Sequence, residues 1–268
     1  MSGSAFSPPC VPLPAAVAAL QTQGFAVLSA ASVREWLGPD AAALDDLPAL
    51  WSGLPPDNHL KDGGHYRRRR HGSLVVAGAT VQAVPHRAHW QPVEYNALHG
   101  GMERWFEPLL PAFSANAAWH VLLQRLGELT SALRGAQTWF AEAHQFRIDT
   151  DGGIGRPTPE GAHRDGVDLV AVFMVGRHGI KGGETRVFEA LGPQGQRFTL
   201  TEPWSVLLLD DSRVIHESTP IQPLVPGELG WRDTLVVTLR GGAFQDEVPV
   251  GSAGEEAGAT GIAPPSGS

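Results

Sequence analysis

The sequence predicts a mainly β protein with flanking helices, and two observations support this fold class. From residue 139 onward, short apolar runs rich in β-branched and aromatic residues alternate with turn residues at nearly regular intervals, which is typical of a sandwich or barrel. Before residue 139, apolar residues recur mainly at helical spacing. Because the helices precede the strands and do not alternate with them, we expect them to support the β-structure from outside.

The N-terminal half contains three segments with a predictable structure. Residues 15–23 and 32–37 are expected to form short helices, the second with Ser32 at its N-cap, and residues 25–28 are expected to form a strand. The longest helical pattern covers residues 105–133, where apolar side chains recur every three or four positions. This pattern predicts one or two helices packed on a sheet.

Glycine and proline delimit the strands of the second half, as in Asp151-Gly152-Gly153 and Lys181-Gly182-Gly183. We expect strands at residues 143–148, 169–175, 184–188, 196–200, 205–209, 213–216 and 234–240. Residues 15–248 are expected to form a single domain, after a flexible N-terminus at residues 1–14. Residues 249–268 are rich in Gly, Ala, Ser, Pro and Glu and are expected to be disordered.

The composition excludes several classes of protein. With 268 residues, of which 42% are hydrophobic and 18% charged, the chain resembles a soluble globular domain. No apolar run approaches the roughly 18 residues of a membrane span, and residues 1–14 lack the pattern of a signal peptide. The single cysteine, Cys10, excludes an intrachain disulfide and favours a reducing, cytoplasmic location. A formal net charge of -8 argues against general binding to nucleic acid or anionic membranes.

Residues 67–70 are four consecutive arginines. Because no basic stripe flanks them, we favour a local role over a phosphate-binding patch. The local roles are a solvated strand edge and a cover over an anionic substrate.

His163 and Asp165 are spaced so that an extended segment turns both side chains to one face. They follow a loop rich in Pro and Gly and precede the apolar strand at residues 169–175, so they lie at the mouth of a strand. A second apolar strand leads through the turn Asp210-Asp211-Ser212 to His216. Non-haem Fe(II) oxygenases bind their metal through two imidazoles and one carboxylate on one face. This arrangement leaves the other positions of the metal open for co-substrates. We therefore predict a metal site formed by His163, Asp165 and His216.

Arg232 and Thr234 open the last predicted strand. An arginine there suits a dicarboxylate co-substrate, since its planar fork binds a carboxylate through two hydrogen bonds. Arg240 has the same strand parity, so alternation alone leaves both arginines open. We favour Arg232, because Thr234 supplies a neighbouring hydroxyl.

Two other catalytic signatures are incomplete. His163-Arg164-Asp165 also matches the start of a kinase catalytic loop, but Val170 stands where that loop requires asparagine. The sequence contains no Gly-x-Ser-x-Gly motif of a serine hydrolase and no cysteine cluster for a structural zinc site.

Four segments carry a combined resemblance to a known family. They are Pro159-Glu160-Gly161-Ala162-His163-Arg164-Asp165-Gly166, Gly182-Gly183-Glu184, residues 209–216 and residues 232–238. Together they resemble the bacterial 2-oxoglutarate/Fe(II)-dependent dioxygenase family that includes L-isoleucine 4-hydroxylase. The resemblance covers residues 63–240, and its motifs are specific in combination.

The resemblance implies a double-stranded β-helix (jelly-roll) core with N-terminal helical support. It implies Fe(II) bound by His163, Asp165 and His216, 2-oxoglutarate bound by Arg232 and Thr234, and O2 as a further co-substrate. The implied reaction hydroxylates an aliphatic C–H bond of a free L-amino acid or similar small metabolite and releases succinate and CO2. Arg232 follows His216 at a longer distance than is usual in the superfamily. Related halogenases carry a small residue in place of Asp165, so the carboxylate favours hydroxylation.

Four side chains are candidate ligands of the substrate, namely Gln145, Arg147, Arg69 and Asn96. Gln145 and Arg147 share one strand face, and an amino acid needs a cation for its carboxylate and an acceptor for its ammonium group. Arg147 can equally pair with Asp149 or Asp151, and the sequence leaves both alternatives open. A carrier-bound or peptidyl substrate, and a metal-binding sensor without turnover, are the competing functions.

Overall fold

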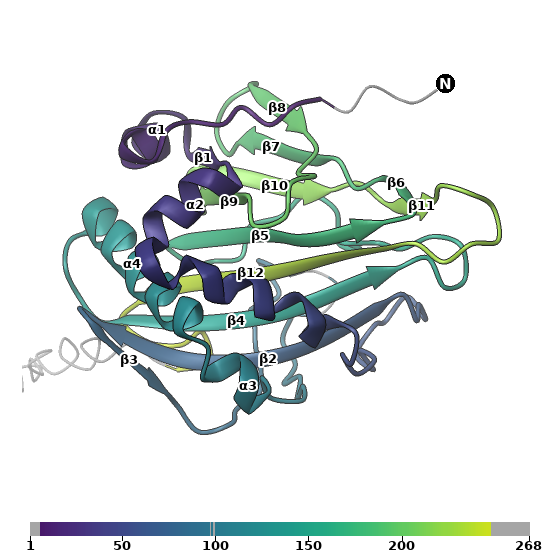
Figure 1. Ribbon diagram of the computed structural model, residues 1–268, viewed down its shortest axis with the longest axis horizontal. Helices are drawn as coiled ribbons and strands as arrows, with labels where there is room; N and C mark the ends of the chain where they lie inside the picture. Colours follow the sequence, from purple (N-terminus) through teal and green to yellow (C-terminus); the bar gives the residue numbers. More distant parts are fainter. Residues whose placement is uncertain (1–5, 97, 99, 248–268) are drawn as a thin grey trace, which may run out of the picture.

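A seven-stranded antiparallel sheet forms the centre of the protein (Figure 1). The computed structural model describes residues 6–96, 98 and 100–247. The strand order is β1-β9-β5-β12-β4-β2-β3. These strands are β1 (Phe25–Leu28), β2 (Arg67–Ala77), β3 (Thr80–Ala83), β4 (Trp139–Asp149), β5 (Leu169–His178), β9 (Val206–Asp210) and β12 (Trp231–Gly241).

A smaller sheet packs against one face of the large sheet. It has the order β10-β7-β8, and a two-stranded sheet of β11 and β6 lies beside it. These strands are β6 (Ile180–Gly182), β7 (Thr185–Glu189), β8 (Gly195–Phe198), β10 (Val214–Ser218) and β11 (Ile221–Pro223). Val187 and Phe198 of the small sheet belong to one buried cluster with Val170 and Leu209 of the large sheet. The two sheets therefore enclose a common interior, where hydrophobic burial joins them.

Helices cover the opposite face of the large sheet (Figure 1). They are α1 (Ala16–Gln23), α2 (Ala30–Leu37), α3 (Pro111–Ser114), α4 (Ala117–Arg134) and the 3-10 helices η1 (Leu13–Ala15), η2 (Gly38–Asp46) and η3 (Pro48–Trp51). Leu122 and Leu126 of α4 share a buried cluster with Ala141 of β4 and Leu239 of β12. The predicted mainly β class with N-terminal helical support is confirmed.

Two helix boundaries differ from the prediction for local reasons. Ser29, and not Ser32, is the N-cap of α2, since its side chain accepts a hydrogen bond from Ser32 N at 3.2 Å. In the segment 105–133 the helices begin only at Pro111, because Leu110 precedes a proline and is held extended. Asn116 then caps α4 by accepting a hydrogen bond from Trp119 N.

The arginine run lies in β2, a strand that the sequence pattern did not reveal. Arg67 and Arg69 are buried, whereas Arg68 and Arg70 are half-buried. The alternation is that of a strand with one face turned to the interior. The run is therefore neither a solvated edge nor a surface patch. The sequence analysis also missed the short strands β3, β6 and β11.

The N-terminal segment that was expected to be flexible is described from residue 6. Val11 N donates a hydrogen bond to Val27 O at 2.9 Å, and Thr199 N donates one to Phe6 O at 3.0 Å. Residues 1–5 and the tail at residues 249–268 lie outside the described residues. Among the described helices, none combines the length and the apolar character that crossing a membrane requires.

Candidate metal centre

The backbone brings His163 and His216 together, although 52 positions of sequence separate them. His163 lies in the loop between β4 and β5, and His216 lies in β10. His163 N donates to His216 O at 3.0 Å, and His216 N donates to His163 O at 2.9 Å. This reciprocal pair places both imidazoles on one side of the bridge, where their ring centroids are 4.5 Å apart.

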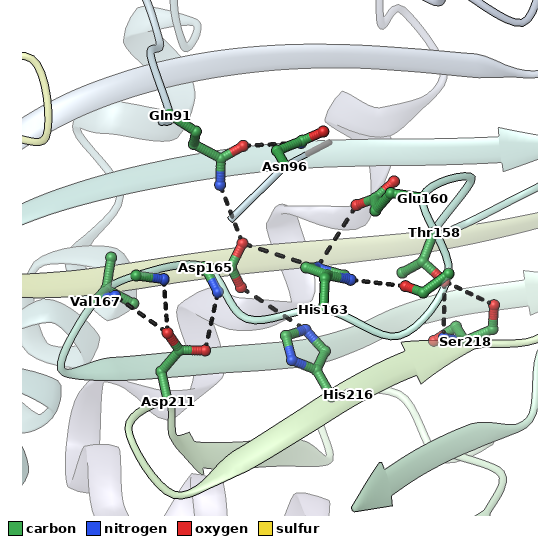
Figure 2. Close-up of polar contacts among 12 residues, drawn as sticks. Gln91, Asn96, Thr158, Glu160, His163, Asp165, Val167, Asp211, His216 and Ser218 are labelled. Carbon is green, nitrogen blue, oxygen red and sulfur yellow. Dashed lines mark hydrogen bonds and ion pairs between the residues drawn. The ribbon is translucent and has the colours of Figure 1, made fainter. Parts of the chain in front are cut away.

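Asp165 completes the group, as Figure 2 shows. Its Oδ1 lies 3.9 Å from His163 Nε2, and its Oδ2 lies 3.7 Å from His216 Nε2. One ligand atom of each residue lies within 4.8 Å of the others, which is a separation that a single metal ion can bridge. The structure thus brings together the three ligands that the sequence predicted.

Hydrogen bonds orient the ligands before a metal binds. His163 Nδ1 donates to Gly161 O at 2.9 Å, so the lone pair of the neutral ring lies on Nε2, which faces Asp165. The side chain of Asp211 accepts hydrogen bonds from the backbone N–H groups of Asp165, Gly166 and Val167 at 3.0, 2.7 and 3.1 Å. Asp211 therefore fixes the loop that carries Asp165. The sequence analysis had noted this residue only as part of a turn.

Burial controls the protonation of these ligands. It lowers the pKa of His216 to about 3, with a further contribution from His163, so His216 is neutral and keeps a lone pair for a metal. Burial also acts to lower the pKa of His163, but the carboxylates of Asp165 and Glu160 outweigh it and raise that pKa above its ordinary value. The donor set of two imidazoles and a carboxylate fits a divalent transition metal with open positions.

The three ligands lie on the wall of a cavity that also contains Arg232 and Thr234 of β12. Arg232 is 4% exposed, and its Nε has no hydrogen-bond partner among the described residues. Burial lowers the pKa of Arg232 to about 10, so the guanidinium still carries its charge near neutral pH. A buried guanidinium whose Nε lacks a hydrogen-bond acceptor is costly, and the site is therefore suited to a carboxylate ligand.

Arg240, the alternative arginine, lies elsewhere. Its Nη1 donates to Ala243 O at 2.7 Å and to Phe244 O at 3.1 Å, and the residue does not line the cavity. Arg232 and Arg240 share strand parity, as predicted, but only Arg232 lies at the end of β12 beside the metal ligands.

Two of the four candidate substrate ligands line the cavity, namely Arg69 and Asn96. The alternation of β4 turns Phe146 to the cavity and therefore Gln145 and Arg147 away from it. Gln145 is fully buried on the other face of the sheet. Arg147 pairs with Asp233 through two hydrogen bonds of 2.8 and 2.6 Å, and not with Asp149 or Asp151.

Arg69 of β2, Glu142 and His144 of β4, and His89 line the far wall of the cavity, and His71 lies behind them. Glu142 Oε1 lies 3.0 Å from His71 Nε2 and 3.1 Å from His89 Nδ1, so both imidazoles donate to it. Arg69 Nη2 donates to His144 Nδ1 at 2.7 Å. Burial lowers the pKa of all three histidines, that of His89 to about 4, and the rings are therefore neutral.

The imidazoles of His71, His89 and His144 are a second group whose ligand atoms lie within 4.8 Å of one another. Their surroundings do not favour a cation. The lone pair on His144 Nδ1 accepts from Arg69, which places the ring proton on Nε2. Arg69 and Arg104 are also close enough to lower the pKa of His144. We interpret this group as a hydrogen-bonded wall.

The cavity is lined by charged side chains of both signs that each have one buried atom without a hydrogen-bond partner among the described residues. Arg67 pairs with Asp57 at 2.7 Å through Nε, but its Nη2 is buried without a partner in the described part of the chain. The same holds for Nε of Arg104 and Oε2 of Glu160. Sequence reasoning considered Arg67 but missed Arg104, which follows a loop without periodic pattern. In the sequence, only its position three residues before His163 connects Glu160 with the site.

Comparisons with known proteins agree with this geometry. The family model described as 2OG-Fe dioxygenase matches residues 48–238. The crystal structure of a bsmA homolog from Methylobium petroleophilum PM1 is 54% identical, with a TM-score of 0.84, and the match covers 91% of this chain and 98% of that one. None of the curated proteins searched matches the sequence.

Two more distant structures share the fold. IDO from Bacillus thuringiensis is 16% identical with a TM-score of 0.70, and the match covers 85% of this chain and 98% of that one. The Fe(II)/(alpha)ketoglutarate-dependent dioxygenase TqaL is 19% identical with a TM-score of 0.66, over 85% of this chain and 86% of that one. The jelly-roll core expected from the sequence resemblance is confirmed.

Proposed function

Because the chain belongs to the 2OG-Fe dioxygenase family, we propose that it hydroxylates an aliphatic C–H bond of a free L-amino acid or similar small metabolite. The chain is a dioxygenase that uses Fe(II), 2-oxoglutarate and O2, as its family does. O2 is the oxidant of this reaction: one of its oxygen atoms goes to the substrate and the other to succinate, which forms as 2-oxoglutarate is oxidised and releases CO2, and bound Fe(II) would activate the O2. The protein supplies orientation, charge and exclusion of water.

His163, Asp165 and His216 hold the iron in this proposal, and Arg232 holds the far carboxylate of 2-oxoglutarate. Support comes from the unpartnered Nε of Arg232 and from its place in the cavity. Thr234 lies two residues further along the same strand face and also lines the cavity, so its hydroxyl can donate to the same carboxylate. Val172 and Val236 line the cavity from neighbouring strands and exclude water from this site.

The observation that carries the amino acid substrate is the opposite charge of Glu160 and the arginines. Glu160 Oε1 lies 3.6 Å from His163 Nε2, so this carboxylate is next to the metal site, and its Oε2 is unpartnered within the described chain. Arg104 lies close enough to Glu160 for their charges to interact. A zwitterion satisfies both, with its ammonium group on Glu160 and its carboxylate on Arg104 and Arg67.

Arg69 and Asn96 complete the substrate pocket in this proposal. The guanidinium of Arg69 lies 3.7 Å from the ring centroid of Phe106 and 4.5 Å from that of Phe146, so it is a rigid part of the wall. The combined motif resemblance to the family that includes L-isoleucine 4-hydroxylase supports an amino acid as well. It leaves the identity of the substrate side chain to experiment.

The test measures succinate release and substrate oxidation with Fe(II), 2-oxoglutarate and O2 in the presence of each L-amino acid. We expect at least one amino acid to stimulate succinate release and to gain one oxygen atom by mass spectrometry. The N-acetyl and α-amide forms of that amino acid are the matched controls, and each should lose the stimulation. Stimulation only by a peptide or a carrier-bound residue would contradict the proposal and favour the competing substrate class.

Variants of the two charged partners sharpen this test. Glu160→Gln and Arg104→Leu should each raise the KM for the amino acid by about ten- to hundredfold, because each removes a charge-assisted hydrogen bond. Arg197→Leu is a control, since this residue lies in β8 and does not line the cavity. Unchanged KM values in both site variants would exclude the zwitterion assignment.

A further inference from the structure

Gln91 links the metal ligand Asp165 to the opposite wall of the cavity (Figure 2). Its side chain is buried, with 7% of the residue exposed. Gln91 Oε1 accepts hydrogen bonds from Asn96 Nδ2 at 3.1 Å and from Arg104 Nη2 at 3.0 Å. Gln91 Nε2 donates to Asp165 Oδ1 at 3.2 Å.

The orientation of the Gln91 amide follows from the chemistry of its neighbours. A guanidinium can only donate hydrogen bonds, so the amide oxygen must face Arg104. The amide nitrogen then faces Asp165, whose ionised carboxylate can only accept. A flipped amide would lose the hydrogen bonds with Arg104 and with Asp165. Gln91 therefore presents a fixed donor to one oxygen of the metal ligand.

The two oxygens of Asp165 have different surroundings. Oδ1 accepts from Gln91 Nε2, whereas Oδ2 lies 3.7 Å from His216 Nε2 and receives no hydrogen bond that we observe from the described residues. A hydrogen bond to Oδ1 engages electron density that this oxygen would otherwise give to a metal. Binding through Oδ2 alone uses three protein ligand atoms in total, whereas binding through both oxygens would occupy a fourth position.

We propose that Gln91 is a positioning residue that restrains Asp165 to bind iron through one oxygen and thereby keeps a coordination position open for 2-oxoglutarate. Arg104 and Asn96 hold Gln91 in the orientation that this requires. The inference rests on the proposed function only in taking His163, Asp165 and His216 as the metal ligands. It does not depend on which substrate is oxidised.

Gln245 provides a matched control, because it also donates to Asp165 but through the backbone. Gln245 Nε2 donates to Asp165 O at 2.6 Å and to Gly166 O at 3.0 Å, and its side chain lines the same cavity. Removal of Gln245 therefore loosens the loop without freeing the carboxylate. If Gln91 only stabilised the loop, the two glutamines would give the same phenotype.

The experiment compares Gln91→Leu with Gln245→Leu by titrating metal-free protein with Co(II) under anaerobic conditions. The visible absorption of Co(II) reports the coordination geometry, and a second titration adds 2-oxoglutarate. For Gln91→Leu we expect a Co(II) Kd within about threefold of the wild type, altered Co(II) bands, and a Kd for 2-oxoglutarate raised by about tenfold. Gln245→Leu should keep the wild-type bands and show no selective loss of 2-oxoglutarate.

A second, more conservative variant keeps the test decisive if Gln91→Leu does not fold. Gln91→Glu keeps an acceptor for Arg104 and Asn96 but removes the donor to Asp165, and it should show the same selective loss of 2-oxoglutarate affinity. Three outcomes would overturn the inference: parallel losses of Co(II) and 2-oxoglutarate affinity, wild-type behaviour of both Gln91 variants, or the same phenotype in Gln245→Leu.

This test and that of the proposed function fail separately. The titrations contain no amino acid, so failure to find a hydroxylated amino acid leaves their result unaffected. Conversely, an amino acid substrate can be confirmed while the Gln91 variants behave like the wild type.

Discussion

The three metal ligands act as a unit, because each supplies one donor atom to a group whose atoms lie within 4.8 Å. Replacing any of His163, Asp165 or His216 by alanine removes one donor and leaves the other two without their third partner. We predict that each variant loses iron-dependent succinate formation by at least about a hundredfold. The measurement is succinate release under saturating 2-oxoglutarate.

The matched control for these variants is His178→Ala. His178 is an exposed histidine of β5 that stacks on Trp231 and does not line the cavity. It should retain wild-type activity. Near-normal succinate formation in any one of the three ligand variants would show that the metal is held elsewhere.

Variants of Arg232 and Arg240 test which of the two arginines binds 2-oxoglutarate. Arg232→Ala should raise the KM for 2-oxoglutarate by roughly ten- to hundredfold, because it removes the cation that faces the cavity. Arg240→Ala should leave that KM unchanged, since its guanidinium is engaged by backbone carbonyls. The steady-state dependence on 2-oxoglutarate measures both, and a larger effect in Arg240→Ala would reverse the assignment.

At the scale of elements, strand alternation explains both the success and the failure of the sequence analysis. Apolar strands such as β5 and β9 were predicted, because their residues are buried on both faces and read as continuous apolar runs. β2 was missed because its interior face carries Arg67, Arg69 and His71, which look like surface residues in a sequence. The fold places Asp57 beside Arg67 and Glu142 beside His71, and these carboxylates offset the cost of burying the two side chains.

The same alternation decides the substrate residues. Gln145 and Arg147 share a face, as predicted, but it is the face opposite the cavity. The sequence shows which residues of a strand share a face, but it does not show which of the two faces is turned to the cavity. The neighbouring residues His144 and Phe146 face the cavity instead. Because each face of β4 carries a polar residue here, the sequence did not show which face would line the cavity.

The burial of His89 against Glu142 of β4 also predicts how stability depends on pH. Burial lowers the pKa of His89 to about 4 in the folded protein, whereas the ordinary value is 6.5. Between these values the unfolded chain binds a proton that the folded protein does not. The free energy of unfolding therefore falls as the pH drops from 6.5 to about 4, and His89 accounts for roughly 3 kcal/mol of that fall.

His89→Gln tests this dependence, because glutamine does not titrate and can still donate to Glu142. Urea denaturation between pH 7 and pH 4 should show a shallower loss of stability in the variant than in the wild type. His71, His144, Glu142 and Asp57 also have lowered pKa values and contribute to the slope that persists. Equal slopes in the two proteins would contradict a neutral, buried His89.

Across the whole molecule, the group proposed to bind the metal could be predicted from the sequence, whereas the pocket proposed to bind the substrate could not. His163 and Asp165 are neighbours in sequence, and His216 follows a strand, so their type and spacing carry the signal. Arg104 and Glu160 come from two separate loops and meet only when the sheets close around the cavity. No periodicity connects such residues, and the unpartnered Nε of Arg104 and Oε2 of Glu160 are visible only in three dimensions, within the described part of the chain.

Among the residues that the structure describes, two groups have metal-binding geometry, and their different surroundings predict one metal ion per chain. His163, Asp165 and His216 include an anionic ligand and one imidazole oriented by a backbone carbonyl. The group of His71, His89 and His144 has no anionic member, and Arg69 already donates to one of its nitrogens. Metal analysis after dialysis against Fe(II) or Co(II) should therefore give about one equivalent in the wild type.

Variants of the two groups, His163/Asp165/His216 and His71/His89/His144, then show which of them binds the one equivalent of metal. His163→Ala/His216→Ala should bind almost no metal, because two of three ligands are gone and the second group does not compensate. His89→Gln should keep about one equivalent, with unchanged visible bands for Co(II). A full equivalent that persists in the double variant and disappears with His89→Gln would show that the far wall of the cavity is itself a metal site.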